Sequence, residues 1–156
     1  MKLKIRQRMF ALADTYDIYD EKDQPKYYVR NEILSLLHHI HVYDKDEKEV
    51  GVIHQKFALA FPDFKIEMNG KIIGTISKDL SFFVPKYSID YLGWKCQGDI
   101  FGFDYTVIDK EGKEILSIDK KIISLTDFYI ADIQNDEDEI PALLLVLAID
   151  AANCGK

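Results

Sequence analysis

The last segment of the chain is apolar on every side. From Ala142 to Ala152 the sequence reads ALLLVLAIDAA, and Asp150 is its only polar residue. A helix of this composition has no face suited to water, so it either crosses a membrane or lies inside protein. A membrane span needs about 20 apolar residues, and this run is shorter. We therefore predict no transmembrane segment, and the rest of the chain must enclose the helix.

The sequence before this segment has the alternation and the turns of β-strands. Leu3, Ile5 and Met9 fall on one face of a strand and the basic residues between them on the other. Polar turn sequences recur as DEKDQP, DKDEKEVG, NG and DKEGKE. Similar units lie between them: QRMFALADTYDIYD, HQKFALAFPDFKIE, SKDLSFFVPKYSID and DKKIISLTDFYIAD, with variants in RNEILSLLHHIHVYD and GDIFGFDYTVID.

Each unit reads as a strand end, a short apolar loop, a new strand and a polar turn. The period of roughly 23 residues is typical of repeated supersecondary units, and the repeats predict about twelve strands. An antiparallel sheet of this size can close into a barrel, which removes its edges. Its interior is too wide for its own side chains, and the C-terminal helix can fill it. We predict an all-β fold, a closed antiparallel barrel around a buried apolar helix, as one domain over residues 1–156.

The repeat, the ending SLTDFYIADIQNDEDEIPALLLVLAIDAA and the basic opening strand resemble the LURP-one-related family. This resemblance implies the tubby-like fold, in which a β-barrel encloses a C-terminal hydrophobic helix. Through tubby domains and the related phospholipid scramblases, it also implies a connection to membrane lipids, phosphoinositides in particular.

The overall charge and the N-terminus limit the classes of function. A net charge of −7 argues against a nucleic-acid partner. The opening MKLKIRQRMF lacks the apolar region of a signal peptide, and Cys96 and Cys154 form no CxxC pair. We expect a cytoplasmic protein, peripheral to the membrane where it binds lipid, with reduced cysteines.

Strands that simply run up and down place the polar turns at one end of the barrel, which we call the turn rim. Its acidic residues are Asp20, Glu21, Asp23, Asp44, Asp46, Glu47, Glu49, Asp109, Glu111 and Glu114. The segment NDEDE also ends there, at the N-terminus of the helix, where the helix dipole favours negative charge.

The apolar loops lie at the other end, the loop rim, each beside basic residues. Cations meet anionic headgroups while apolar loop tips enter the membrane interface. For headgroup binding we predict Arg8, Arg30, Lys56, Lys78, Lys120 and Lys121, and for apolar membrane contact Phe57, Phe61, Phe82 and Phe83. In one alternative the loops cover the barrel end and the basic residues are merely solvated. In another the protein is an interaction scaffold for a protein partner, using the acidic rim or a face of histidines.

The histidines of HHIHV allow two interpretations. His39 and His41 share one face of a strand, and His54 falls opposite His39 if the turn centres on Asp46 and Glu47. Three imidazoles on one face could hold zinc or copper, or they could be ordinary polar residues of an exposed strand. We assign no metal ligand here.

Catalytic motifs are absent from the sequence. It has no GxSxG, no glycine-rich phosphate loop and no HExxH, and the helix occupies the usual ligand cavity of a barrel. We predict a non-enzymatic protein without a cofactor. Asp150, near the helix C-terminus, is opposed by the helix dipole. We expect it to be a structural buried charge with a partner among the loop-rim cations.

Overall fold

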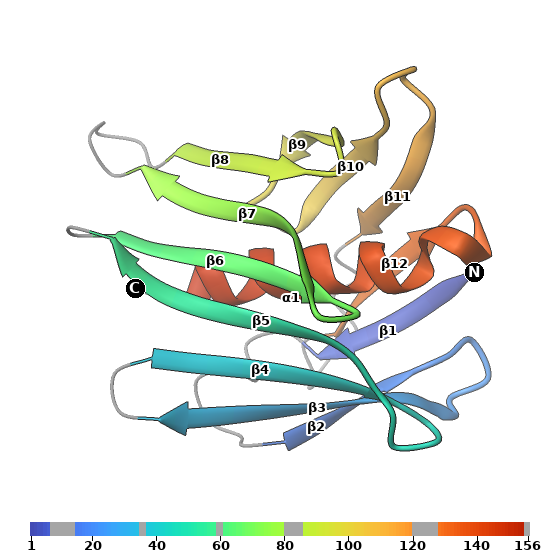
Figure 1. Cartoon of the computed structure of the whole chain (residues 1–156). Coiled ribbons are helices and arrows are strands. Elements are labelled where there is room, and N and C mark those ends of the chain that lie inside the picture. Colours follow the sequence, from blue (N-terminus) through green and yellow to red (C-terminus); the bar gives the residue numbers. More distant parts are fainter. Residues whose placement is uncertain (7–14, 35–36, 59–60, 80–85, 120–127, 155–156) are drawn as a thin grey trace.

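In the computed structural model, the described part of the chain forms twelve antiparallel strands around one long helix (Figure 1). The structure describes residues 1–6, 15–34, 37–58, 61–79, 86–119 and 128–154. The strands are β1 (Lys2–Arg6), β2 (Thr15–Tyr19), β3 (Pro25–Leu34), β4 (Leu37–Asp44), β5 (Glu49–Ala58), β6 (Phe61–Met68), β7 (Lys71–Asp79), β8 (Lys86–Tyr91), β9 (Lys95–Asp99), β10 (Asp104–Ile108), β11 (Glu114–Asp119) and β12 (Phe128–Ile133). A short 3₁₀ turn, η2 (Asp136–Asp138), leads into the helix α1 (Glu139–Cys154).

The strands follow the up-and-down order that the repeats predict. The order in the sheet is β8-β7-β6-β5-β4-β3-β2-β1-β12-β11-β10-β9, so all neighbours but one are consecutive in the chain. The exception is the pairing of β1 with β12, in which Leu3 lies opposite Ala131 and Ile5 opposite Tyr129. This pair joins the two ends of the chain and curls the sheet into a barrel.

The barrel is nearly closed, with a seam between β8 and β9. Both strands lie within the described residues, yet no ladder joins them, although one tight turn connects them through the Trp94 N–H and the Tyr91 carbonyl at 2.8 Å. Side chains fill the seam instead. The rings of Tyr87 and Phe101 lie 5.0 Å apart. The Tyr87 hydroxyl donates to Asn153 Oδ1 at 2.6 Å, and Asn153 Nδ2 donates to the Ile100 carbonyl at 3.1 Å.

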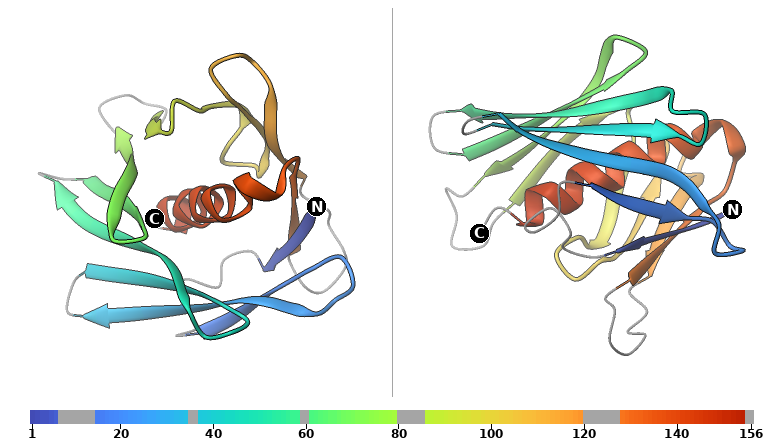
Figure 2. Two further views of the ribbon diagram at one scale, coloured as in Figure 1. Left: turned by 45° about the vertical axis from the view of Figure 1, so that its right-hand side comes forward. Right: turned by 90° about the horizontal axis from the view of Figure 1, so that it is seen from below.

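The helix α1 runs through the interior of the barrel, as two further views show (Figure 2). Every residue from Ala142 to Ala152 is buried, which confirms that the apolar run is enclosed by the sheet. The inward side chains of the strands surround it, among them Leu3, Ile5, Ile18, Ile40, Val42, Ile53, Phe64, Ile66, Ile76, Leu116 and Ile118. No helix of the described chain is both long and apolar enough to cross a membrane.

Asp150 is fully buried inside the barrel. Burial, and then the neighbouring Cys96 and Asp150, raise the pKa of Tyr105 of β10. The predicted burial of this carboxylate is confirmed. Its pairing with a cation of the loop rim stays a prediction. Two of the cations proposed for that role, Arg30 and Lys56, have side chains on the outer surface.

Three turns at one end of the barrel share the same hydrogen-bond pattern. Asp20, Asp44 and Asp109 each start a turn, and one carboxylate oxygen accepts two backbone N–H groups, from the residues two and four positions later, at 2.8–3.0 Å. The N–H of the same aspartate donates to the carbonyl four positions later. The similar turn sequences therefore encode one local structure.

The residue three positions after Asp44 has a left-handed backbone, which predicts a stabilising substitution. Glu47 has φ 60°, whereas the equivalent position of the Asp109 turn is Gly112 with φ 83°. A left-handed conformation costs a non-glycine residue about 1–2 kcal/mol, partly offset by the extra freedom of glycine in the unfolded chain. We expect Glu47→Gly to raise the free energy of unfolding in urea by about 0.5–1 kcal/mol. Glu47→Ala is the control, because it removes the same charge but keeps a Cβ atom. If Glu47→Ala raises the free energy of unfolding as much as Glu47→Gly does, the left-handed backbone is not the reason for the gain.

A second prediction concerns the closest approach of the sheet to the helix. A Cβ atom added to Gly51 of β5 would lie 2.5 Å from Leu144 Cδ1 and 3.0 Å from the Glu67 carbonyl oxygen. We expect Gly51→Ala to lower the free energy of unfolding by about 1–3 kcal/mol through overpacking. Urea unfolding of Gly51→Ala combined with Leu144→Val is the check, because the shorter side chain makes room. If the double variant loses as much unfolding free energy as the two single variants together, the contact with Leu144 is not the cause of the destabilisation.

Candidate functional site

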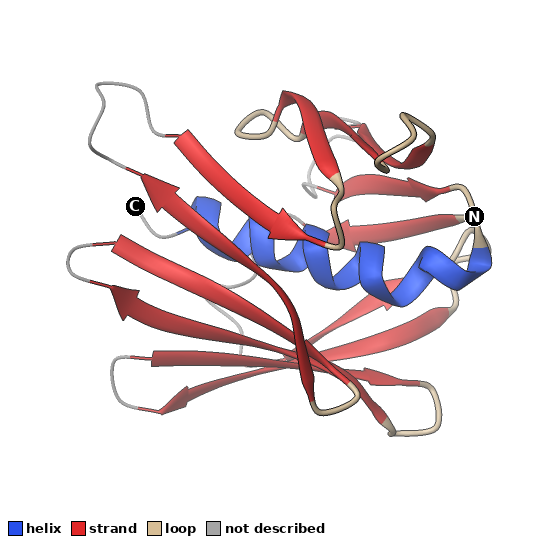
Figure 3. Ribbon diagram, turned by 45° about the horizontal axis from the view of Figure 1, so that its top comes forward, coloured by secondary structure: helices blue, strands red, loops and turns tan. Residues whose placement is uncertain are grey.

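The described strand ends fall into the two predicted rims (Figure 3). The turn rim carries the three aspartate-anchored turns, η2 and the start of α1, and its acidic residues are exposed or half-buried. Glu139 at the start of the helix is mostly buried and pairs with Lys26 of β3. Backbone N–H groups, that of Gln24 first, hold the pKa of Asp20 below its usual value. This end of the barrel is therefore strongly negative.

Of the residues predicted to contact lipid at the opposite end, the loop rim, the structure describes two side chains, those of Arg30 and Lys56. Arg30 lies on the outer face of β3, its side chain 62% exposed and its Nε 3.8 Å from Glu32 Oε1. Such a surface pair contributes at most about 1 kcal/mol, so the guanidinium is accessible. Lys56 is exposed near the end of β5, opposite Asp63 of β6.

The remaining predicted lipid contacts are only partly placed by the structure. Lys78 is in β7, and Phe57 and Phe61 are at the end of the β5–β6 hairpin, where Phe57 lies opposite Pro62 and Phe61 opposite Ala58. The side chains of these three residues lie outside the described part of the chain. The other predicted contacts fall entirely outside the described residues; these are Arg8, Phe82, Phe83, Lys120 and Lys121.

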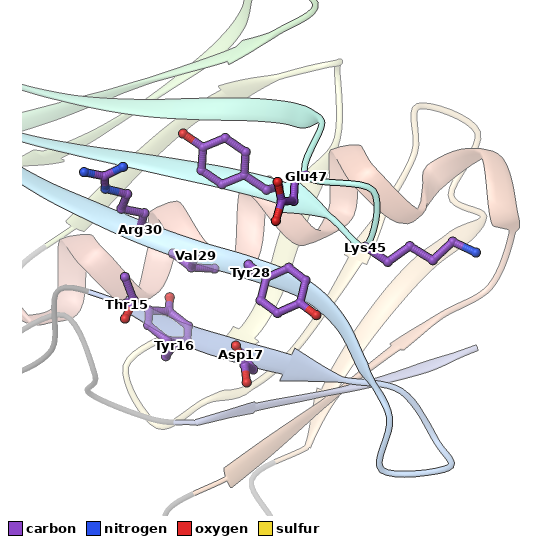
Figure 4. A pocket seen from close by; sticks show the side chains of 9 residues that line it. Thr15, Tyr16, Asp17, Tyr28, Val29, Arg30, Lys45 and Glu47 are labelled. Carbon is purple, nitrogen blue, oxygen red and sulfur yellow. The ribbon is translucent and has the colours of Figure 1, made fainter.

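A groove on the outer face of β2, β3 and β4 extends from Arg30 toward the turn rim (Figure 4). Its volume is about 530 Å³, and it is lined by Thr15, Tyr16, Asp17, Tyr28, Val29, Arg30, Tyr43, Lys45 and Glu47. The strand register builds it in rows across the sheet. One row consists of Asp17, Tyr28 and Tyr43, and the next places Thr15 opposite Arg30.

The groove combines aromatic surface with charges of both signs. Tyr28 is 39% exposed, and Tyr43 is half-buried with a pKa raised by burial and then by Glu49. Arg30 and Lys45 supply positive charge, and Asp17 and Glu47 supply negative charge. Sequence reasoning found Arg30 but missed the groove, because the outward residues of these strands show ordinary polar alternation. The hollow arises from how three twisted strands lie together, for which no local motif exists.

The histidines do not form the three-imidazole surface considered from the sequence. The predicted register is confirmed, with His39 opposite His54, and their Nδ1 atoms lie 3.2 Å apart. His41 lies on the same strand as His39, but its Nδ1 is 2.7 Å from Glu49 Oε2 and its ring stacks on Tyr43. The described residues contain no group of three or more side chains arranged to hold one metal ion.

Cys96 is the free cysteine whose side chain the structure describes. Burial raises the pKa of Cys96 to about 12, so its thiol stays protonated at neutral pH. A protonated, largely enclosed thiol is a poor nucleophile, and Cys96 is best read as a packing residue beside Tyr105.

Comparisons with known proteins agree with this architecture. The family model described as LURP-one-related matches residues 1–150. The "Uncharacterized protein YxjI" of Bacillus subtilis (strain 168) is 28% identical over 150 residues, which are 96% of this chain and 92% of that protein. The X-ray structure of the Arabidopsis thaliana protein AT5G01750 superposes with a TM-score of 0.64 over 96% of this chain and 90% of that one, at 12% identity, which shows a shared fold. The chain belongs to the LURP-one-related family.

Proposed function

We propose that this protein is a binding domain that contacts anionic phospholipid headgroups through its loop rim. The observation that carries the proposal is the separation of charge along the barrel. The polar turns at one end carry a large excess of acidic residues, whereas basic and acidic residues together flank the apolar loops of the other end, where Lys56 lies opposite Asp63. Arg8, Arg30, Lys56, Lys78, Lys120 and Lys121 supply the cations, and Phe57, Phe61, Phe82 and Phe83 supply the apolar contact.

Separation of the two rims makes such binding compatible with a net charge of −7. An anionic membrane repels the turn rim more strongly than the loop rim and attracts the cations of the loop rim, so the protein is oriented before contact. Each Lys or Arg near an anionic surface contributes about 1 kcal/mol, and this attraction decays within a Debye length. Exposed cations such as Arg30 and Lys56 can make this contact at little desolvation cost, because they stay at the interface.

The third prediction tests this orientation with two charge-matched variants. One carries Arg8, Lys56, Lys78 and Lys120 replaced by Glu, and the other carries Lys22, Lys45, Lys110 and Lys113 of the turn rim replaced by Glu. Both variants have the same net charge. We expect the wild type and the turn-rim variant to sediment with vesicles containing phosphatidylserine or phosphoinositide, less at high salt, and the loop-rim variant to stay in the supernatant.

Neutral vesicles of phosphatidylcholine provide the baseline, and circular dichroism checks that each variant is folded. Equal sedimentation of both folded variants would overturn the proposal. Failure of the wild type to bind any anionic vesicle would also overturn it. The acidic turn rim would then become the surface to examine, as the contact for a basic protein partner.

A further inference from the structure

We propose that His39 and His54 form a two-imidazole binding site for a divalent transition-metal ion, on the outer face of the barrel and independent of lipid binding. The two residues are opposite each other on β4 and β5, the middle of a continuous ladder from β3 to β6. Neighbouring strands on both sides fix the backbone positions. The pair is therefore held by rigid elements, as a metal site requires.

The distance between the two rings suits one shared ion. His39 Nδ1 and His54 Nδ1 are 3.2 Å apart, with the rings perpendicular at 89°. Two metal–nitrogen bonds of about 2.0–2.1 Å at a tetrahedral angle place the nitrogens about 3.3–3.4 Å apart. A shared ion lies about 35° off the line that joins the two nitrogens, so each ring must turn by about that angle to direct its lone pair at the ion.

An outer carboxylate already orients one of the ligands. His54 Nε2 donates to Glu67 Oε2 at 2.9 Å, which places the proton on Nε2 and leaves the Nδ1 lone pair free. This carboxylate–histidine arrangement supports many metal-bound imidazoles. With His54 protonated at Nε2, the 3.2 Å contact between the two Nδ1 atoms requires His39 to carry its proton on Nδ1 and donate it to His54 Nδ1. When metal binds, His39 releases that proton from Nδ1 and is protonated at Nε2 instead, so it stays neutral.

The surroundings place two carboxylates near the site and keep it open. Two carboxylates flank the pair: Glu67, and Glu32, which lies opposite His39 on β3 and pairs with Arg30; Lys65 lies opposite His54 on β6. The side chain of His54 is 24% exposed, so water can complete the coordination. Imidazole ligands suit Cu²⁺ and Zn²⁺, and Cu²⁺ binds the more tightly.

His41 is the matched control, because it is a histidine of the same strand face that is engaged elsewhere. Its Nδ1 contacts Glu49 at 2.7 Å and its Nε2 lies 3.7 Å from Glu32. We expect equilibrium dialysis of the untagged protein against CuCl₂ and against ZnCl₂ to show one saturable site. His39→Gln and His54→Gln should lose binding by tenfold or more, Glu67→Gln should weaken it by about 10–100-fold, and His41→Gln should retain it.

Electron paramagnetic resonance of the Cu²⁺-loaded wild type gives a second readout that needs no variant. We expect hyperfine coupling from two imidazole nitrogens. The proposal is overturned if no saturable binding occurs, if His41→Gln loses binding as much as His39→Gln and His54→Gln do, or if the spectrum shows no nitrogen ligand. Melting temperatures of the metal-free variants separate lost ligands from lost fold.

Discussion

The enclosure of α1 is the constraint on which the rest of the structure depends. A helix that is apolar on all sides leaves water only if a surface surrounds it completely, and each large side chain that is buried contributes about 1.5–3 kcal/mol. A sheet can provide that surface only by curling around the helix, which the pairing of β1 with β12 achieves. The close fit is visible at Gly51, where a side chain would overlap Leu144. The helix and the sheet are thus a single core, and neither has a hydrophobic partner without the other.

Because α1 and the inward side chains of the described strands fill the interior, the candidate sites among the described residues lie on the outer face or at the rims. The outer face over β2, β3 and β4 holds a groove with Arg30, Tyr28 and Tyr43, and the adjoining face over β4 and β5 holds the histidine pair. The turn rim is built from repeated aspartate turns, whose carboxylates satisfy backbone N–H groups and therefore serve structure before function. Three of the negative charges at that rim, those of Asp20, Asp44 and Asp109, are therefore part of how the turns fold.

The sequence predicted most of the fold, because the signals involved are local and repeated. The apolar run indicated the buried helix, the turns indicated the hairpins, and counting from the turn at Asp46 and Glu47 placed His54 opposite His39. It predicted less of the sites, which depend on distances between side chains. Nothing local distinguishes His41, which Glu49 holds at 2.7 Å, from His39, which faces another imidazole. The groove and the seam depend on strand twist and on the packing of Tyr87 and Phe101, and neither leaves a pattern in one segment.

The seam shows why the predicted closed barrel is only nearly closed. Closing β8 onto β9 would require a ladder where the Tyr87 and Phe101 rings now lie, and the last turn of the helix makes the connection instead. Asn153 satisfies the Tyr87 hydroxyl on one edge and the Ile100 carbonyl on the other. The polar end of α1 therefore complements its apolar middle. The middle determines that a sheet must surround the helix, and the end joins the two edges at which that sheet stops.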